Sequence, residues 1–496
     1  VQQFAEVGPA ERTLLDSIQR PIVLLPKRTD HAIAPAVAPG NACFGVMLPY
    51  TPLHHLLLRE GFVALVMTSG NLSEEPICIA NEDALARLGA VADRFLMHDR
   101  DIYLRSDDSI LRRAGGDTRF LRRSRGYVPV PVFLKAAQAS VLAVGGELKN
   151  TVCLTRERFA FVSQHIGDLE NRQTEDFLQL TIDHLQRILD IRPEVIACDL
   201  HPDYRSTRYA HARGDLPVVG VQHHHAHIVS CLAEHQVEGP VIGLAMDGTG
   251  YGPDHTVWGG EALIADAGSY TRAAHLRTVA MPGSASAIRE PWRMGVSLLE
   301  AFLGDGWRDL PLPIVQGLND QQVAVTVQMV RKGLNSPLTS SLGRLFDGVA
   351  AILGLYPRVA FEGQAAMALE HLAADEMAPA YPISWSGTAP RIIDTGVIVR
   401  GVCEDVVAGI SPVRIAARFH ETLIQGLTDL CAELRQETGL DRVALSGGVF
   451  QNLRLLEGLL DRLAAAGFAV YAHRQVPTTD GGLSLGQAVA AAAMLG

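Results

Sequence analysis

The stretch that decides the fold is residues 241–266, VIGLAMDGTGYGPDHTVWGGEALIAD. It reads as an apolar strand that ends in a glycine-rich turn and is followed by a second strand. Residues 141–168, VLAVGGELKNTVCLTRERFAFVSQHIGD, have the same order of strand, glycine turn and strands. The chain therefore contains two similarly built segments.

Each of these segments continues in a similar way. The first is followed by a predicted helix at 174–189 and by strands at 195–199 and 218–222. The second is followed by a long helical insertion at about 284–440, a strand at 443–446, a helix at 452–466, a strand at 469–472 and a last helix from Gly482. Two βββαβα halves, each with a glycine-rich turn that can face a phosphate chain, are typical of the duplicated actin-like ATPase fold. We expect an α/β protein in which residues 141–496 form this domain.

The region before it has a different pattern. Short apolar strands are predicted at 21–25 and 63–67 and a helix at 83–88, which indicates a separate α/β domain at 1–130. The segment 131–140, PVFLKAAQAS, is interpreted as a linker.

Composition excludes several classes of protein. The chain has 496 residues, which is too long for one hydrophobic core, and 48% of them are hydrophobic, as in a folded protein. Its net charge of -11 argues against a general nucleic-acid or membrane-surface binder. The seven cysteines include no CxxC pair, which fits a reducing cytoplasm. Because the chain opens on Val1 rather than Met, we expect a fragment of a longer protein.

A histidine cluster is the first candidate site. In residues 221–235, VQHHHAHIVSCLAEH, His223 and His227 are four apart and would share one face of a helix, and the pair His224 and His227 could do the same. Asp247 ends the strand VIGLAMD, and Asp480 precedes the last helix. Two histidines and two aspartates could hold Fe²⁺ or Zn²⁺. A polar helix start, a turn aspartate and a helix cap are the alternatives for the residues taken singly.

Other motifs suit nucleotide chemistry. LSGGVFQN at 445–452 ends a strand in two glycines before a helix, and GRLFD at 343–347 and FEGQA at 361–365 lie in the insertion. TSGNLSEEP at 68–76, HDRDIYLRSDDS at 98–109 and LRRSRGYV at 121–128 offer hydroxyls, an amide and arginines for a phosphate and a carbamoyl-like group. Tight turns, solvated charges and surface ion pairs are the alternative readings.

Together with GGELKNT and SQHIGDLE, these motifs closely resemble those of the HypF carbamoyltransferase family of [NiFe]-hydrogenase maturation, over essentially the whole chain. Residues 1 to about 130 resemble the later part of a YrdC-like domain. Residues 141–496 resemble the actin-like domain shared with the enzymes that make threonylcarbamoyl-adenosine in tRNA.

The resemblance implies roles for individual residues. His224 and His225 would face substrate or lie behind the metal ligands. The metal ligands would be His223, His227, Asp247 and Asp480. The nucleotide contacts of the actin-like domain would be Asp347, Glu362, Gly363, Gly447, Gly448 and Asn452. The adenylation site of the YrdC-like domain would use Ser69, Asn71, Arg105, Asp108, Ser109, Arg123 and Arg125.

The resemblance also implies an activity. Carbamoyl-adenylate would form from carbamoyl phosphate and ATP with Mg²⁺, and its carbamoyl group would pass to the C-terminal cysteine thiol of the partner HypE for cyanide ligand synthesis. No nucleic-acid or membrane partner is implied, and a homodimer stays open. The family's N-terminal acylphosphatase-like and zinc-finger domains are not in this chain, so we expect hydrolysis of carbamoyl phosphate to be lost and full adenylation to be affected. Two alternatives are a small-molecule O-carbamoyltransferase, in which the domain order is reversed, and a nucleotide-binding scaffold without transfer activity.

Overall fold

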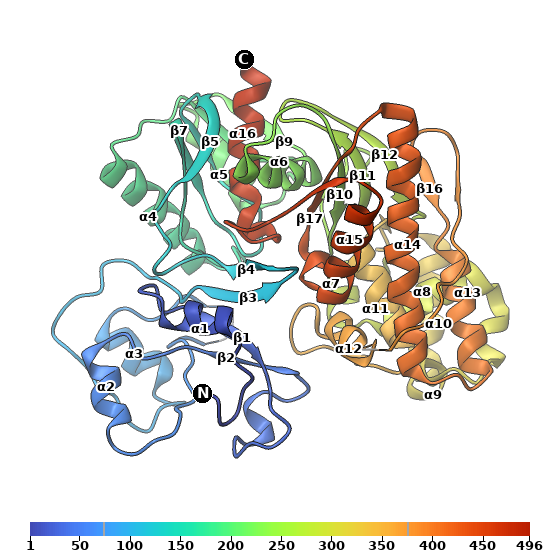
Figure 1. Ribbon diagram of the computed structural model, residues 1–496, viewed down its shortest axis with the longest axis horizontal. Helices are drawn as coiled ribbons and strands as arrows, with labels where there is room; N and C mark the ends of the chain where they lie inside the picture. Colours follow the sequence, from blue (N-terminus) through green and yellow to red (C-terminus); the bar gives the residue numbers. More distant parts are fainter. Residues whose placement is uncertain (73–74, 374–375) are drawn as a thin grey trace. The chain divides into compact units, whose positions relative to one another are not determined.

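The computed structural model describes residues 1–72, 75–373 and 376–496. The chain forms two compact units. The first unit comprises Val1–Val221 and His473–Gly496, and the second comprises Gln222–Ala472. In Figure 1 the first unit runs from blue to green and includes the red C-terminal helix α16.

The N-terminal part of the first unit is a small α/β structure. Its sheet has the order β2-β1-β3-β4, with β1 (Ile22–Pro26), β2 (Cys43–Val46), β3 (Ile110–Ala114) and β4 (Asp117–Arg122). Its helices are α1 (Pro9–Asp16), the 3₁₀ turn η1 (Pro35–Val37), α2 (Pro52–Leu58) and α3 (Asn81–Leu88). The core on which this sheet rests contains Phe4, Leu15, Val23, Leu25 and Phe44.

Two of the three elements predicted here are present. The strand at 21–25 and the helix at 83–88 are confirmed as β1 and α3. The predicted strand at 63–67 is wrong, because these residues have no strand partner among the described residues and Val66 is 77% exposed. An apolar run forms a strand only where a neighbouring strand can satisfy its backbone.

The segment interpreted as a linker is also different from the prediction. Residues 132–138 form the strand β5 (Val132–Gln138), which pairs antiparallel with β7 (Cys153–Val162). Val132 and Leu134 are buried on one face while Phe133 between them is exposed. This alternation is that of a half-buried strand, so Pro131 precedes a strand rather than marking an open connection.

The rest of the first unit is the first actin-like half. Its sheet has the order β5-β7-β6-β8-β9, with β6 (Val141–Ala143), β8 (Val195–Asp199) and β9 (Val218–Val221) running parallel. The helices are α4 (Arg172–Leu189), α5 (Arg205–Arg213), the 3₁₀ turn η4 (Asp480–Gly482) and α16 (Leu483–Leu495). Helix α16 packs against β6 and β7 and is buried along most of its length, so the end of the chain completes this half.

The second unit contains the second half. Its sheet has the order β15-β16-β12-β11-β10-β17-β18. The strands are β10 (Val241–Met246), β11 (Gly260–Ala265), β12 (Tyr270–Leu276), β15 (Trp385–Ser386), β16 (Arg391–Ile393), β17 (Arg442–Ser446) and β18 (Ala469–Ala472). Helix α6 (His223–His235) packs against β10 and β17, and α15 (Leu453–Ala465) packs against β18. The predicted α/β class with a duplicated actin-like arrangement is confirmed.

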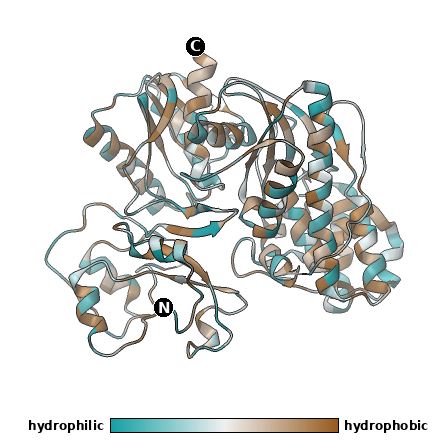
Figure 2. Cartoon of the chain, in the orientation of Figure 1, coloured by the Kyte–Doolittle hydropathy of each residue, from teal (hydrophilic) through white to brown (hydrophobic). Residues whose placement is uncertain are grey.

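The insertion is mostly helical, as predicted. Its helices are α7 (Ala285–Arg289), α8 (Trp292–Leu303), η2 (Gly304–Asp309), α9 (Pro313–Gly317), α10 (Asp320–Lys332), α11 (Leu342–Ile352), α12 (Gln364–Ala373), α13 (Gly396–Val407) and α14 (Pro412–Thr438). A small two-stranded antiparallel sheet pairs β13 (Val279–Ala280) with β14 (Leu338–Thr339), and β16 joins the main sheet beside β12. Bands of brown and teal along α14 in Figure 2 show its amphipathic pattern. None of the described helices is both long and apolar enough to span a membrane.

Candidate metal and nucleotide site

The histidine cluster forms the start of helix α6. Gln222 is its N-cap, and its Oε1 accepts a hydrogen bond from the backbone N–H of His225 at 2.9 Å. His223 and His227 therefore lie one turn apart, and both side chains are buried. The ring of His225 points elsewhere, because its Nε2 donates to the carbonyl of Asp266 at 2.7 Å. The ring of His224 lies edge-on to that of His223, with centroids 5.2 Å apart, and its Nδ1 is 3.3 Å from the amide nitrogen of Gln222.

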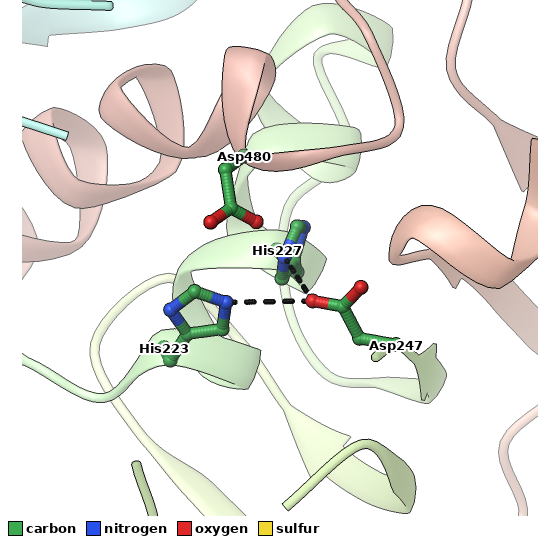
Figure 3. Close-up of side chains that lie close together, drawn as sticks. All are labelled: His223, His227, Asp247 and Asp480. Carbon is green, nitrogen blue, oxygen red and sulfur yellow. Dashed lines mark ion pairs between the residues drawn. The ribbon is translucent and has the colours of Figure 1, made fainter. Parts of the chain in front are cut away.

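Asp247 faces the histidine pair from the end of β10. Its Oδ2 lies 3.5 Å from His223 Nε2 and 3.2 Å from His227 Nε2 (Figure 3). Its Oδ1 accepts hydrogen bonds from the backbone N–H groups of Gly248 at 2.8 Å and Gly448 at 3.0 Å. Burial raises the pKa of this carboxyl, but the two imidazoles more than offset that effect and hold the pKa well below its usual range. Asp247 is therefore an anionic acceptor at neutral pH.

The glycines of this strand and turn allow the helix and the strand to approach each other. A Cβ on Gly250 would lie 2.3 Å from His224 Cε1 and 2.8 Å from His223 Cδ2. A Cβ on Gly243 would lie 2.6 Å from the side chain of Ile228. Glycine at these positions is what lets the imidazoles reach the carboxylate.

The three residues form a donor set for a transition metal. The ligand atoms of His223, His227 and Asp247 all lie within 4.8 Å of one another. Two imidazole nitrogens and a carboxylate oxygen fit Fe²⁺ or Zn²⁺. The fourth predicted ligand, Asp480, belongs to the first unit, where it opens η4 and lies beside Gly146. Figure 3 draws it with the other three, and its ligand role stays a prediction.

The SGG turn after β17 is pressed against the end of β10. Gly447 has a φ of 106°, and a Cβ there would lie 2.2 Å from the carbonyl oxygen of Met246. The next residue, Gly448, opens the 3₁₀ turn η3 (Gly448–Gln451) and donates its N–H to Asp247. The predicted nucleotide turn and the predicted metal ligand are thus in direct contact.

The side chain of Asn452 makes contacts that the sequence did not indicate. Its Oδ1 caps α15 by accepting the N–H of Leu455 at 2.9 Å, and its Nδ2 donates to Nε2 of His420 at 2.9 Å. His420 is buried on α14, and its Nδ1 donates to the carbonyl of Ala416 at 2.8 Å. Burial lowers the pKa of His420 to about 4, so the ring is neutral. His420 was missed because it lies outside every motif and reaches Asn452 only through the packing of α14.

The remaining nucleotide candidates lie in the insertion. Asp347 is buried on α11, where its Oδ2 is 2.9 Å from Arg344 Nη2. Burial raises the pKa of Asp347 to about 6; Arg344 opposes this shift, and the charge of Glu362 adds to it. Glu362 is exposed, and Gly363 follows it with a φ of 78°. The charge of Glu362 thus acts on Asp347, and the role of both residues in nucleotide binding stays a prediction.

A cavity in the first unit collects part of the predicted adenylation site. It has a volume of about 380 Å³ and is lined by Ser69, Asn71 and Arg123. Residues 73–74 of the motif TSGNLSEEP lie outside the described residues. Other lining residues also belong to the quoted motifs but are not among the predicted site residues. They include Asp107, Arg122, Lys149, Thr151, His165 and Asp168.

Several predicted adenylation residues are tied to the backbone. Arg123 donates to the carbonyls of Val162, Tyr127 and Val130 at 3.3, 3.1 and 2.5 Å. Burial lowers the pKa of Arg123 to about 10.

The other members of this set have similar bonds. Arg125 pairs with Asp108 at 2.6 Å and donates to the carbonyls of Gln19 and Arg20. The hydroxyl of Ser109 donates to the carbonyl of Arg125 at 2.9 Å, and Arg105 donates to the carbonyl of Ile77 at 2.7 Å. These contacts position the strands around the cavity.

Comparisons with known proteins give three family matches. Residues 243–487 match "Carbamoyltransferase, Kae1-like Domain, second subdomain", residues 136–234 match "HypF Kae1-like domain", and residues 1–124 match the Sua5, YciO and YrdC family described as "Telomere recombination". A HypF homolog of Cupriavidus necator is 39% identical, and the match covers 71% of this chain and 92% of that protein.

The chain belongs to the HypF carbamoyltransferase family.

Other HypF proteins are similar over nearly the whole chain. Carbamoyltransferase HypF2 of Cupriavidus necator is 43% identical over 98% of this chain, and the match covers 65% of that relative. The chain thus spans slightly less than two thirds of the length of this HypF. A crystal structure of full-length HypF "in the phosphate- and nucleotide-bound form" superposes with a TM-score of 0.95 at 43% identity, covering all of this chain and 77% of that one. HypF of T. kodakarensis has a TM-score of 0.92 at 32% identity, covering all of this chain and 66% of that one.

Proposed function

We propose that this chain is an ATP-dependent carbamoyltransferase that forms carbamoyl-adenylate and transfers the carbamoyl group to the C-terminal cysteine thiol of HypE. The observation that carries the proposal is the convergence of His223, His227 and Asp247, with the same aspartate bonded to the SGG turn at Gly448. Asp480 is proposed as the fourth ligand. The bound metal would be Fe²⁺ or Zn²⁺ and would withdraw charge from the phosphate of the leaving AMP.

The transfer step needs no nucleophile from this chain. The thiolate of the acceptor attacks the carbamoyl carbon, the bond from that carbon to the phosphate oxygen breaks, and AMP leaves with the electron pair. Four of the chain's seven cysteines do not suit this role, because burial raises the pKa of Cys153, Cys198, Cys403 and Cys431 to about 12. An external acceptor thiol is therefore consistent with the protein.

The cavity in the first unit supports the adenylation half of the proposal. Arg122 and Lys149 bring positive charge to its wall, beside the hydroxyl of Ser69 and the amide of Asn71. Cationic groups suit the phosphates of ATP with its Mg²⁺, and the polar groups suit a planar carbamoyl. Burial, together with Arg122 and Lys149, lowers the pKa of His165 to about 3, so this wall residue is a neutral hydrogen-bonding group. Arg105, Asp108, Ser109, Arg123 and Arg125 are proposed to hold the strands that shape this site.

We place the proposed nucleotide site of the second unit at the glycine turn after β10 and the SGG turn after β17. Gly447 and Gly448 would provide backbone close to the phosphates, and Asp347, Glu362 and Gly363 would contact the nucleoside. Asn452 would contribute indirectly, because its cap fixes the start of α15 next to the SGG turn. The full-length HypF that superposes on this chain was crystallised in a nucleotide-bound form, which supports this proposal.

The acceptor's mass tests the function. Purified chain is incubated with ATP, carbamoyl phosphate and either HypE or an aminoglycoside, and the intact mass of the acceptor is measured by mass spectrometry. In an arm that does not depend on the hydrolysis of carbamoyl phosphate, we expect a gain of about 43 Da on the HypE cysteine and none on the aminoglycoside. An arm with ammonium carbamate in place of carbamoyl phosphate bypasses the hydrolysis step. If neither acceptor gains mass in either arm while nucleotide still binds, only the alternative of a nucleotide-binding scaffold without transfer activity would be left.

A further inference from the structure

Arg344 is a buried cation at the glycine turn that none of the assigned roles uses. It lies in the first turn of α11, whose N-cap is Ser341. Only 4% of its surface is exposed. A buried arginine is uncommon unless its donors are engaged, so its surroundings indicate what it binds.

The start of α11 is fixed to the turn that follows β10. The hydroxyl of Ser341 lies 2.7 Å from the carbonyl oxygen of Asp247 and 2.8 Å from that of Gly248. The N–H of Gly343 donates to Asp247 O at 3.1 Å, and a Cβ on Gly343 would lie 2.9 Å from Gly248 Cα. The guanidinium of Arg344 is thereby held beside the glycine turn, since a Cβ on Gly248 would lie 3.6 Å from its Nη2.

The donors of this guanidinium are only partly used. Its Nη2 forms the ion pair with Asp347 at 2.9 Å. Its Nε and Nη1 are buried and have no hydrogen-bond partner among the described residues. A guanidinium offers N–H groups on several edges in one plane, and oxygens of phosphate or carboxylate match that geometry.

We propose that Arg344 binds a phosphate oxygen of the nucleotide at the glycine turn 247–252, with Asp347 holding the guanidinium in place. This inference rests on the proposed nucleotide site of the second unit. It adds a cation from α11 to that site. The residues already proposed there supply only carboxylates, an amide and backbone groups. Ion pairing with Asp347 leaves the remaining N–H groups for the ligand. A phosphate group would satisfy these donors, whereas a nucleoside without phosphate would not.

Isothermal titration with ATP, AMP and adenosine tests the proposal on the full chain. Arg344→Lys keeps the positive charge but loses the planar donors. Arg344→Gln removes the charge and keeps a single amide group in place of the guanidinium donors. We expect both variants to bind ATP and AMP roughly tenfold or more weakly and adenosine within about twofold of wild type. Arg358→Lys, at an exposed ion pair with Glu290 in the same unit, is the matched control and should bind all three ligands like wild type.

The other outcomes separate the proposals. If adenosine weakens as much as ATP, Arg344 acts through Asp347 on the nucleoside and the phosphate role is wrong. If no ligand weakens, Arg344 has no part in binding. If wild-type chain binds none of the three ligands, the nucleotide site in "Proposed function" fails as well. Should Arg344→Lys not fold, as judged by its melting curve, Arg344→Gln alone decides between these results.

Discussion

The backbone N–H of Gly448 donates a 3.0 Å hydrogen bond to Oδ1 of Asp247, whose other oxygen faces the histidine pair. One carboxylate thus joins the SGG turn after β17 to the two imidazoles of α6. A shift of the Asp247 carboxylate must therefore also shift the SGG turn, and a shift of that turn must move the carboxylate.

Asp247→Asn separates the two roles of this side chain. The Asn oxygen can still accept the N–H groups of Gly248 and Gly448, but an amide nitrogen replaces the oxygen that faces the histidines. We expect metal content to fall at least about tenfold while the melting temperature changes little. Elemental analysis and thermal unfolding measure the two effects. Asp461→Asn, exposed on α15, is the control, and full metal occupancy in Asp247→Asn would contradict the donor set.

The histidines should differ in their effects on metal. His227→Ala removes a nitrogen that faces Asp247, so bound metal should be lost. His225→Ala removes a ring that bonds to the carbonyl of Asp266 and packs near Tyr270, so it should cost about 1 kcal/mol of stability and keep the metal. Equal metal content in the two variants would show that the wrong face of α6 has been assigned.

The raised pKa of Asp347 predicts that the stability of the fold depends on pH in a definite direction. Its pKa is raised to about 6 in the folded protein, so between its ordinary value and 6 the folded state binds more protons than the unfolded state. The charged carboxyl therefore costs stability above pH 6, by at most about 3 kcal/mol, and this cost disappears as the pH falls towards 4.

Replacing this residue with Asn should make the effect visible. The free energy of unfolding of Asp347→Asn relative to wild type should rise between pH 4 and pH 8, because the variant lacks the charge that burial disfavours. Denaturant titrations across this range measure the difference. A relative stability that stays constant with pH, or falls as the pH rises, would show that Asp347 is ionised without a cost in the fold.

Asn452 can be tested as a cap and as a donor. Asn452→Asp keeps an oxygen for the N–H of Leu455 but removes the donor to His420, whereas Asn452→Ala removes both. We expect Asn452→Ala to lose about 1–2 kcal/mol of stability and to bind nucleotide more weakly in the second unit. The Asp variant should unfold at a higher denaturant concentration than the Ala variant if the cap matters. Equal midpoints for the two variants would show that Oδ1 contributes little.

The sequence predicted those features that rest on strong local patterns. The strands at 241–246 and 443–446 are apolar runs that end in glycine turns, and the helix spacing of His223 and His227 is a property of the chain alone. The strand at 132–138 is not evident from the sequence, because Val132, Phe133 and Leu134 are all apolar and their alternating burial is seen only in the structure. The apolar run at 63–67 does not form a strand, because strand formation depends on a partner strand that a single segment does not reveal.

Tertiary contacts explain what could not be predicted. His420 meets Asn452 only because α14 packs against α15, and Arg344 meets Gly248 only because α11 starts at the turn after β10. Neither residue is marked by spacing, since the partners are far apart in the chain. The hydrogen bonds of Arg123 and Arg125 to backbone carbonyls likewise cannot be predicted from their motif, which suggests phosphate binding.

The central claim is that His223, His227, Asp247 and Asp480 hold one metal ion. The most direct test is a crystal structure of the chain grown with Fe²⁺ or Zn²⁺, with anomalous data collected on both sides of each absorption edge. We predict one anomalous peak about 2.0–2.2 Å from a nitrogen of each histidine and an oxygen of each aspartate. A peak bound by other residues, or no peak at this histidine pair, would contradict the claim.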